Sequence, residues 1–277
     1  MSRPGHHCGN IAAAPNALFF RSGVTAFYDL TGDYGTAHFG AQRPGCWINC
    51  IPANGVVVMP EASSGCVCSY AIQCTIVFHQ VKANRVWGTF SAPGAVTPVK
   101  HLAVAFGAPG DRKDSAGTLW LGYPRPAGPG SERLVFEFKL DADVAKSGGY
   151  FYKNADSFRV EGTRDPWLFA SGCRGLARCA VPLGAKGPYT VRLLFAAVDG
   201  EKAGQRVFDV KLQGRAVLAG FDVATESGGA LKAVVKEFKA VQGGENLILE
   251  LVPKAPAPTH ASLPIISAME IIAEPGQ

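Results

Sequence analysis

The sequence predicts an all-β protein in two parts, and three observations lead to this prediction. Apolar residues make up 47% of the 277 residues, which is enough for a packed core. The chain has 33 Gly and 19 Pro without a collagen period, which favours short strands joined by many turns. In the second half, apolar and polar residues alternate with a period of two, the pattern of a half-buried strand.

In the first 106 residues, runs rich in β-branched and aromatic residues predict five short strands. They are residues 17–20, 24–28, 46–51, 56–59 and 72–78. Asn54 and Gly55 form a pair typical of a tight hairpin turn. No helical pattern intervenes, so we expect antiparallel sheets.

A boundary is predicted at residues 107–117 (GAPGDRKDSAG), which are small, polar or charged and have no periodicity. Leu119, Trp120 and Leu121 look like the first strand of the second part. We therefore expect one domain over residues 1–113 and another over residues 114–277.

The second part contains further predicted strands at 189–195, 206–212, 246–252 and 265–272. Residues 231–241 (LKAVVKEFKAV) have the composition of a helix. Their period is nearer two than 3.6, which predicts a strand instead.

The charge distribution argues against nucleic acid and against a membrane span. Charged residues make up 18% of the chain, and the net charge of +5 is scattered. No Lys/Arg block reaches five residues, so no phosphate-binding stripe is expected. No apolar run approaches 18 residues, so no transmembrane helix is predicted.

Eight cysteines suggest an oxidising compartment, whereas the N-terminus lacks the apolar segment of a signal peptide. Both observations fit if the chain is the end piece of a longer exported protein. We therefore expect a periplasmic or extracellular location. A cytosolic protein with free thiols is the alternative.

Disulfides are the favoured interpretation of the cysteines. Cys173 and Cys179 bracket a short loop and are candidates to pair, with two free thiols as the alternative. The further disulfide candidates are Cys46, Cys50, Cys66 and Cys68.

Zinc is the other interpretation of the first-half cysteines, with Cys74 and His6, His7 or His79 as extra ligands. Cys46 and Cys50 fit the spacing of a zinc knuckle only loosely, and Cys66 and Cys68 do not fit it. No metal is therefore expected.

Four blocks in the second part resemble the malectin-type domain and keep that family's order. They are residues 189–196 (YTVRLLFA), 204–214 (GQRVFDVKLQG), 217–223 (VLAGFDV) and 265–272 (IISAMEII). The resemblance covers about residues 114–274. It implies a jelly-roll-like β-sandwich and, as in the family's best-known members, binding of glucose-containing oligosaccharides.

Four blocks of the first part resemble the terminal blades of bacterial quinoprotein-like (PQQ-binding-like) β-propeller proteins. They are residues 7–9 (HCG), 27–30 (FYDL), 43–49 (RPGCWIN) and 64–70 (SGCVCSY). The resemblance implies antiparallel, propeller-blade-like strands. A blade takes about 40–50 residues and closure needs at least about four blades, so residues 1–106 hold an incomplete propeller. Missing blades or another protein are then expected as partners, and a bound quinone is not expected.

A sugar site on a β-sandwich needs aromatic faces to stack on the sugar and Asp, Asn or Glu to bind its hydroxyls. The candidates near loops are Tyr123, Tyr150, Tyr152, Asn154, Asp165 and Trp167. The alternative is that these aromatics pack within the fold. In malectin proper the loop equivalent to residues 197–204 carries ligand-binding aromatics, but here it has none.

Motifs of catalysis are not found in the sequence: it has no G-x-S-x-G elbow, H-E-x-x-H or P-loop. We therefore expect a non-catalytic binding module without a cofactor, which recognises a glucan or another oligosaccharide. The alternative is a structural or protein-interaction module, a fragment of a larger propeller protein.

Overall fold

The structure is a computed structural model that describes residues 8–39, 42–48, 50–60, 74–80, 87–90, 98–124, 140–154 and 157–275. Its contacts divide the chain into two compact units. Unit 1 comprises Met1–Gly94, Gly110–Arg112 and Arg125–Phe136; unit 2 comprises Ala95–Pro109, Lys113–Pro124 and Glu137–Gln277. The contact units differ from the predicted domains, since 95–109 is assigned to unit 2. The domain break at 113 and 114 stays a prediction.

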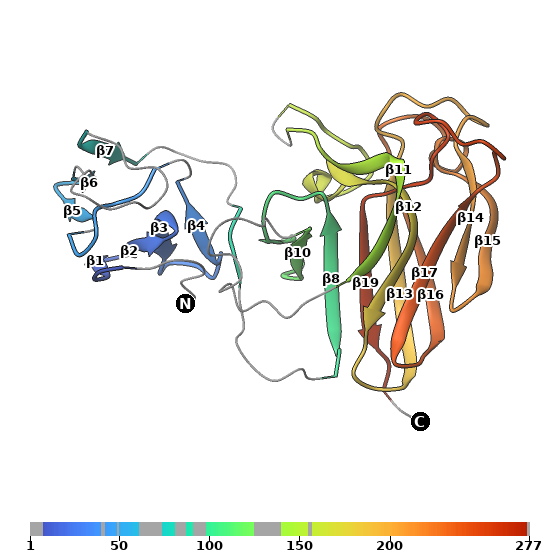
Figure 1. Cartoon of the computed structure of the whole chain (residues 1–277), viewed down its shortest axis with the longest axis horizontal. Coiled ribbons are helices and arrows are strands. Elements are labelled where there is room, and N and C mark those ends of the chain that lie inside the picture. Colours follow the sequence, from blue (N-terminus) through green and yellow to red (C-terminus); the bar gives the residue numbers. More distant parts are fainter. Residues whose placement is uncertain are drawn as a thin grey trace. The chain divides into compact units, whose positions relative to one another are not determined.

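Unit 2 is a β-sandwich of two sheets (Figure 1). In sheet order, the first contains β16 (Ala233–Gly243), β13 (Gly187–Ala196), β19 (Ala268–Ala273), β8 (His101–Phe106), β10 (Leu119–Tyr123) and the two-residue β9 (Arg112–Lys113), of which only Lys113 is assigned to unit 2. In sheet order, the second contains β11 (Asp141–Tyr152), β12 (Ser171–Pro182), β17 (Asn246–Pro253), β14 (Val207–Leu212) and β15 (Arg215–Asp222). The short β18 (Ile265–Ile266) also pairs with β12. The all-β fold and the sandwich of the second part are thus confirmed.

Burial along the strands follows the alternation in the sequence. On β13, Tyr189, Val191, Leu193 and Phe195 are all buried, as the period of two predicts. Residues 231–241 are the ambiguous case, and β16 confirms the strand, since it pairs antiparallel with β13. The ladder of β8 with β10 is parallel, whereas those of β12 with β17, β13 with β19 and β19 with β8 are antiparallel.

A cluster of three aromatic rings joins the two sheets in the core of unit 2. Phe195 on β13 lies 6.2 Å from Phe208 on β14 and 5.0 Å from Phe221 on β15, measured between ring centroids. Phe208 and Phe221 are 5.5 Å apart at an interplanar angle of 90°. Such edge-to-face contacts add to the hydrophobic gain of burial and fix how the sheets face each other.

Within its described residues, unit 2 has two short helical segments between the strands. The α-helix α1 (Val223–Ser227) begins at Asp222, whose carboxylate accepts a hydrogen bond from the backbone N of Ala224 at 3.1 Å. It ends at Gly228 in the left-handed conformation. The 3-10 helix η2 is Pro166–Phe169. No helix in the described ranges is long and apolar enough to cross a membrane.

The described part of unit 1 contains two antiparallel sheets in which neighbouring strands are consecutive in the chain. The first holds β1 (Ala12–Ala14), β2 (Ala17–Ser22), β3 (Val24–Asp29) and β4 (Thr36–His38). The second holds β5 (Ile51–Ala53), β6 (Val56–Met59) and β7 (Ile76–His79). The antiparallel strands predicted for the first part are thus confirmed.

The predicted turn and one predicted strand of unit 1 had different outcomes. Asn54 and Gly55 join β5 to β6 with φ of 50° and 76°, which confirms the hairpin turn. The predicted strand over residues 46–51 is wrong in its first half, because Cys46, Trp47 and Ile48 form a turn. Trp47 has a φ of 73°, which is incompatible with an extended strand.

Candidate functional site

The six predicted site residues lie in three pairs within unit 2. Tyr123 ends β10 and Tyr150 lies on β11, and their rings meet edge to face at 5.9 Å. The Tyr123 hydroxyl donates to the carbonyl of Leu140 at 3.1 Å. Burial raises the pKa of both phenols. This pair is half-buried and packs against the sandwich.

The second pair, Asp165 and Trp167, anchors a turn. The carboxylate of Asp165 accepts hydrogen bonds from the backbone N of Ser115 at 3.0 Å and from its hydroxyl at 2.7 Å. The indole N–H of Trp167 donates to Asp165 at 3.3 Å, and Trp167 is 6% exposed. Little of this ring is accessible to a ligand.

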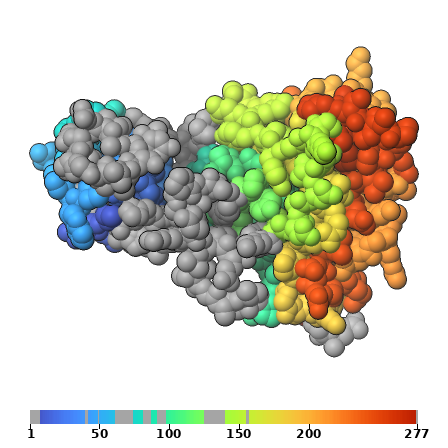
Figure 2. All heavy atoms as spheres, in the orientation of Figure 1, coloured from blue at the N-terminus to red at the C-terminus, as the bar shows by residue number. Residues whose placement is uncertain are grey.

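The third pair, Tyr152 and Asn154, faces solvent at the end of β11. Tyr152 is 40% exposed, and Asn154 is also exposed. The backbone carbonyl of Asn154 accepts hydrogen bonds from the backbone N of Ser157 at 3.1 Å and of Phe158 at 2.8 Å. The yellow-green segment of Figure 2, which contains β11, lies at the visible surface of unit 2.

A network of five charged side chains lies beside this exposed pair, and the sequence reasoning did not find it. Asp199 is its centre: the Nε of Arg174 lies 3.1 Å from Oδ2, and the Nζ of Lys153 lies 3.3 Å from Oδ1. Although burial by itself raises the pKa of Asp199, these two cations hold it below its ordinary value.

The buried half of the network is Arg206 with Glu201. The Nε of Arg206 lies 2.9 Å from Oε1 of Glu201, and its Nη2 lies 3.4 Å from Oδ2 of Asp199. Arg206 also donates to the carbonyl of Leu263. The loop 197–204, which lacks aromatics, is thus tied to the sandwich by ion pairs.

The cysteines differ from the prediction. Cys173 and Cys179 are free thiols on the same strand, β12, where Cys173 stands opposite Tyr150 and Cys179 opposite Ala142. Each thiol therefore has a β11 residue as its cross-strand neighbour, and no short loop brings the two together. Burial raises the pKa of each thiol to about 12.

The first-half cysteines are also not seen as disulfides. Cys50 is a free thiol, the sulfur of Cys46 accepts a hydrogen bond from Nη1 of Arg21 at 3.2 Å, and Cys66 and Cys68 lie outside the described residues. In the part of the chain that the structure describes, no group of three His, Cys, Asp or Glu side chains is placed to hold a metal ion.

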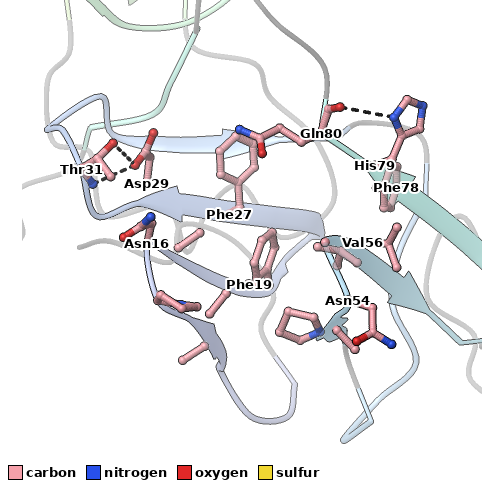
Figure 3. Close-up of a pocket in the computed structure, with 18 of the residues that line it drawn as sticks. Asn16, Phe19, Phe27, Asp29, Thr31, Asn54, Val56, Phe78, His79 and Gln80 are labelled. Atoms are coloured by element: carbon pink, nitrogen blue, oxygen red, sulfur yellow. Dashed lines mark hydrogen bonds between the residues drawn. The ribbon is translucent and has the colours of Figure 1, made fainter.

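Unit 1 contains a groove of about 800 Å³ between its two sheets (Figure 3). A row of four half-buried phenyl rings crosses it. The centroid distances are 6.3 Å from Phe19 to Phe27, 5.2 Å from Phe27 to Phe39 and 4.3 Å from Phe39 to Phe78. Phe19 and Phe27 come from β2 and β3, whereas Phe78 comes from β7.

Polar side chains lie at both ends of this groove. Figure 3 shows Asn16, Asp29 and Thr31 at one end and Asn54 and His79 at the other. Sequence reasoning missed this site because its walls come from residues far apart in the chain. The aromatic residues of the predicted strands were the available signal, but not their convergence.

The family comparison falls mostly on the sandwich of unit 2. The malectin domain family model matches residues 130–257, fewer than half of the 277 residues. This chain is therefore similar to malectin domains over that segment. A search of curated protein sequences gave no match.

Among solved structures, a Bacteroides uniformis beta-glucuronidase is similar with a TM-score of 0.50 and 15% identity, over 73% of this chain and 24% of that one. The ANX2 ectodomain from Arabidopsis thaliana has a TM-score of 0.47 and 15% identity, over 64% of this chain and 42% of that one. This chain thus spans less than half the length of either. At 15% identity, the likeness to the glucuronidase shows the fold alone.

Proposed function

We propose that this protein is a non-catalytic binding module that recognises a glucan or another oligosaccharide on the sandwich of unit 2. The observation that supports this best is the exposed pair Tyr152 and Asn154 at the end of β11. A tyrosine ring stacks on the C–H face of a pyranose, and an amide both donates to and accepts from its hydroxyls.

The charged network supports this proposal because it fixes Lys153, which lies between Tyr152 and Asn154 in the chain. Lys153 donates to the carbonyl of Val198 at 2.6 Å and pairs with Asp199 at 3.3 Å. Asp199 is held in turn by Arg174, whose guanidinium lies 4.8 Å from the ring centroid of Phe151. Because these contacts already order the surface, binding of a ligand costs less side-chain and backbone entropy.

The other four predicted residues are proposed as support for that surface. Tyr150 lies on the same strand as Tyr152, and its packing on Tyr123 orders this end of β11. Asp165 and Trp167 hold the turn at Ser115. These four side chains shape the sandwich surface around the exposed pair.

Calorimetric titration of the full chain with a panel of α- and β-glucans tests the proposal. We expect binding by one class of glucan, and an affinity about tenfold lower, equal to about 1.4 kcal/mol, in Tyr152→Ala. Tyr34→Ala is the matched control, because Tyr34 is 51% exposed in unit 1. Silence across the panel, or equal affinities of the two variants, would refute the sugar site.

A protein-interaction module is the second candidate function, and one feature of unit 1 favours it. Trp47 is 73% exposed, Ile48 61% and Ile51 47%. Exposed tryptophan beside aliphatic side chains is typical of contact surfaces. A second copy of the chain is the simplest partner, so Trp47→Ser is expected to abolish concentration-dependent self-association in ultracentrifugation. A wild type that is monomeric at all concentrations would rule out this version.

We also propose a periplasmic or extracellular location. The malectin match supports it. The cysteines no longer support an oxidising compartment as they did in the sequence, because the predicted pair Cys173 and Cys179 are free thiols. The malectin match lies outside the first 113 residues, so the quinoprotein-like propeller remains a proposal there.

A further inference from the structure

We infer that the groove of unit 1 is a second binding site, and that its ligand is a short neutral oligosaccharide. The site is independent of the surface around Tyr152. Its lining residues all come from unit 1, between β1 and Gln80.

The row of phenyl rings is the first reason. Phe19, Phe27, Phe39 and Phe78 are each half-buried, so each ring keeps an accessible part. The rings of Phe39 and Phe78 stack face to face, with centroids 4.3 Å apart and planes 16° apart, and the ring of Phe27 is tilted 32° from that of Phe39. The ring surface that stays accessible outside this stacked pair suits sugar units, whose C–H-rich faces lose water on contact with aromatic rings.

The second reason is the set of polar groups that the fold does not use. Oδ1 of Asp29 accepts both hydrogen bonds from Thr31, which leaves Oδ2 as an acceptor. Within the described contacts, the side-chain amides of Asn16, Asn54 and Gln80 make no hydrogen bond. They line the groove and are exposed, so a ligand with several hydroxyls would find partners at both ends.

Charge and openness decide the class of ligand. The lining contains one carboxylate and one histidine but neither Lys nor Arg, which disfavours an anion. Every lining residue is exposed or half-buried, so the groove is open to water along its length. A wholly apolar ligand gains most from enclosure, whereas a sugar keeps its outer hydroxyls hydrated. The volume of about 800 Å³ lies within the range of ordinary ligand sites.

Titration of the full chain with maltotetraose, cellotetraose and laminaritetraose tests this inference, with tetragalacturonate as the anionic probe. Each titration is run in the Tyr152→Ala background, in which the sandwich site is expected to bind about tenfold more weakly. We expect one neutral tetrasaccharide to bind. Phe78→Leu, which keeps an apolar side chain but removes the flat ring, is expected to weaken binding about tenfold.

The double variant Asn16→Ala/Gln80→Ala is the second arm and is also expected to weaken binding about tenfold. Neither amide hydrogen-bonds within the described contacts, so this variant should fold even if Phe78→Leu does not, which circular dichroism would verify. Three outcomes would overturn the inference. They are no binding in the Tyr152→Ala background, unchanged affinity in the double variant, and tetragalacturonate binding as tightly as the neutral tetrasaccharide. Either of the first two results would leave the sandwich proposal intact, because that proposal is tested separately by comparing wild type with Tyr152→Ala.

Discussion

Arg206 and Glu201 form a buried ion pair in which Nε and Oε1 lie 2.9 Å apart and the side chains are 1% and 3% exposed. The pair closes the loop 197–204 onto the sandwich. The loop contains no aromatic residue, and its acidic side chains Asp199 and Glu201 hold it through ion pairs. Removing either partner should therefore have a measurable cost in stability.

Glu201→Ala is expected to lower the free energy of unfolding by about 3–5 kcal/mol, because it removes the carboxylate nearest to the buried guanidinium of Arg206. Urea denaturation monitored by circular dichroism measures this change. The matched control is Asp141→Ala, which removes the exposed pair between Asp141 and Arg178 at 2.7 Å. That loss should stay below about 1 kcal/mol, and equal losses in the two variants would contradict the burial argument.

The pH dependence of stability should report on Asp199. Its folded-state pKa lies below the ordinary 3.8, so its contribution is present above that value and is lost as pH falls through the folded-state pKa. Asp199→Asn should therefore be less stable than wild type at pH 7, and the difference should shrink below about pH 4. Unfolding free energies measured from pH 3 to 7 test this. A difference that is the same across the range would exclude the linkage.

The buried thiols should resist alkylation in the folded protein. Burial raises the pKa of Cys173 and Cys179 to about 12 and of Cys50 to about 11, so little thiolate forms at pH 8. Cys74 is exposed. Brief iodoacetamide treatment followed by peptide mass spectrometry should find Cys74 modified well before the other three. Labelling of all four at one rate would show that the native state does not protect them.

Substitution of two glycines with left-handed backbone conformations can distinguish the cost of backbone strain from the cost of steric crowding. Gly107 has a φ of 69°, and a Cβ there would meet the carbonyl oxygens of Phe151 and Gly172. Gly117 has a φ of 87° and nothing within 4 Å of such a Cβ. Gly117→Ala should cost about 1–2 kcal/mol from strain alone, and Gly107→Ala clearly more. Thermal denaturation compares them, and equal shifts in Tm would mean that crowding contributes nothing.

Strand positions were predictable to a large extent because alternation is a local property of the chain. The alternation over residues 206–212 predicted the burial of Phe208, Val210 and Leu212, which β14 confirms. The prediction for residues 46–48 was wrong because the β-propensity of Trp47 and Ile48 does not report the positive φ that the turn requires. The disulfide between Cys173 and Cys179 was inferred from spacing alone, whereas both thiols belong to one strand.

The sequence by itself therefore determined the all-β class, the alternation of the sandwich strands and the residue types available for binding. Only the tertiary structure decided which of these residues come into contact. Glu270 on β19 lies 2.7 Å from His101 on β8 because the two strands are neighbours in one sheet. Phe19 and Phe78 share a groove because it lies between the two sheets from which they come. Such meetings depend on strand order and register, which are set by packing between segments far apart in the chain.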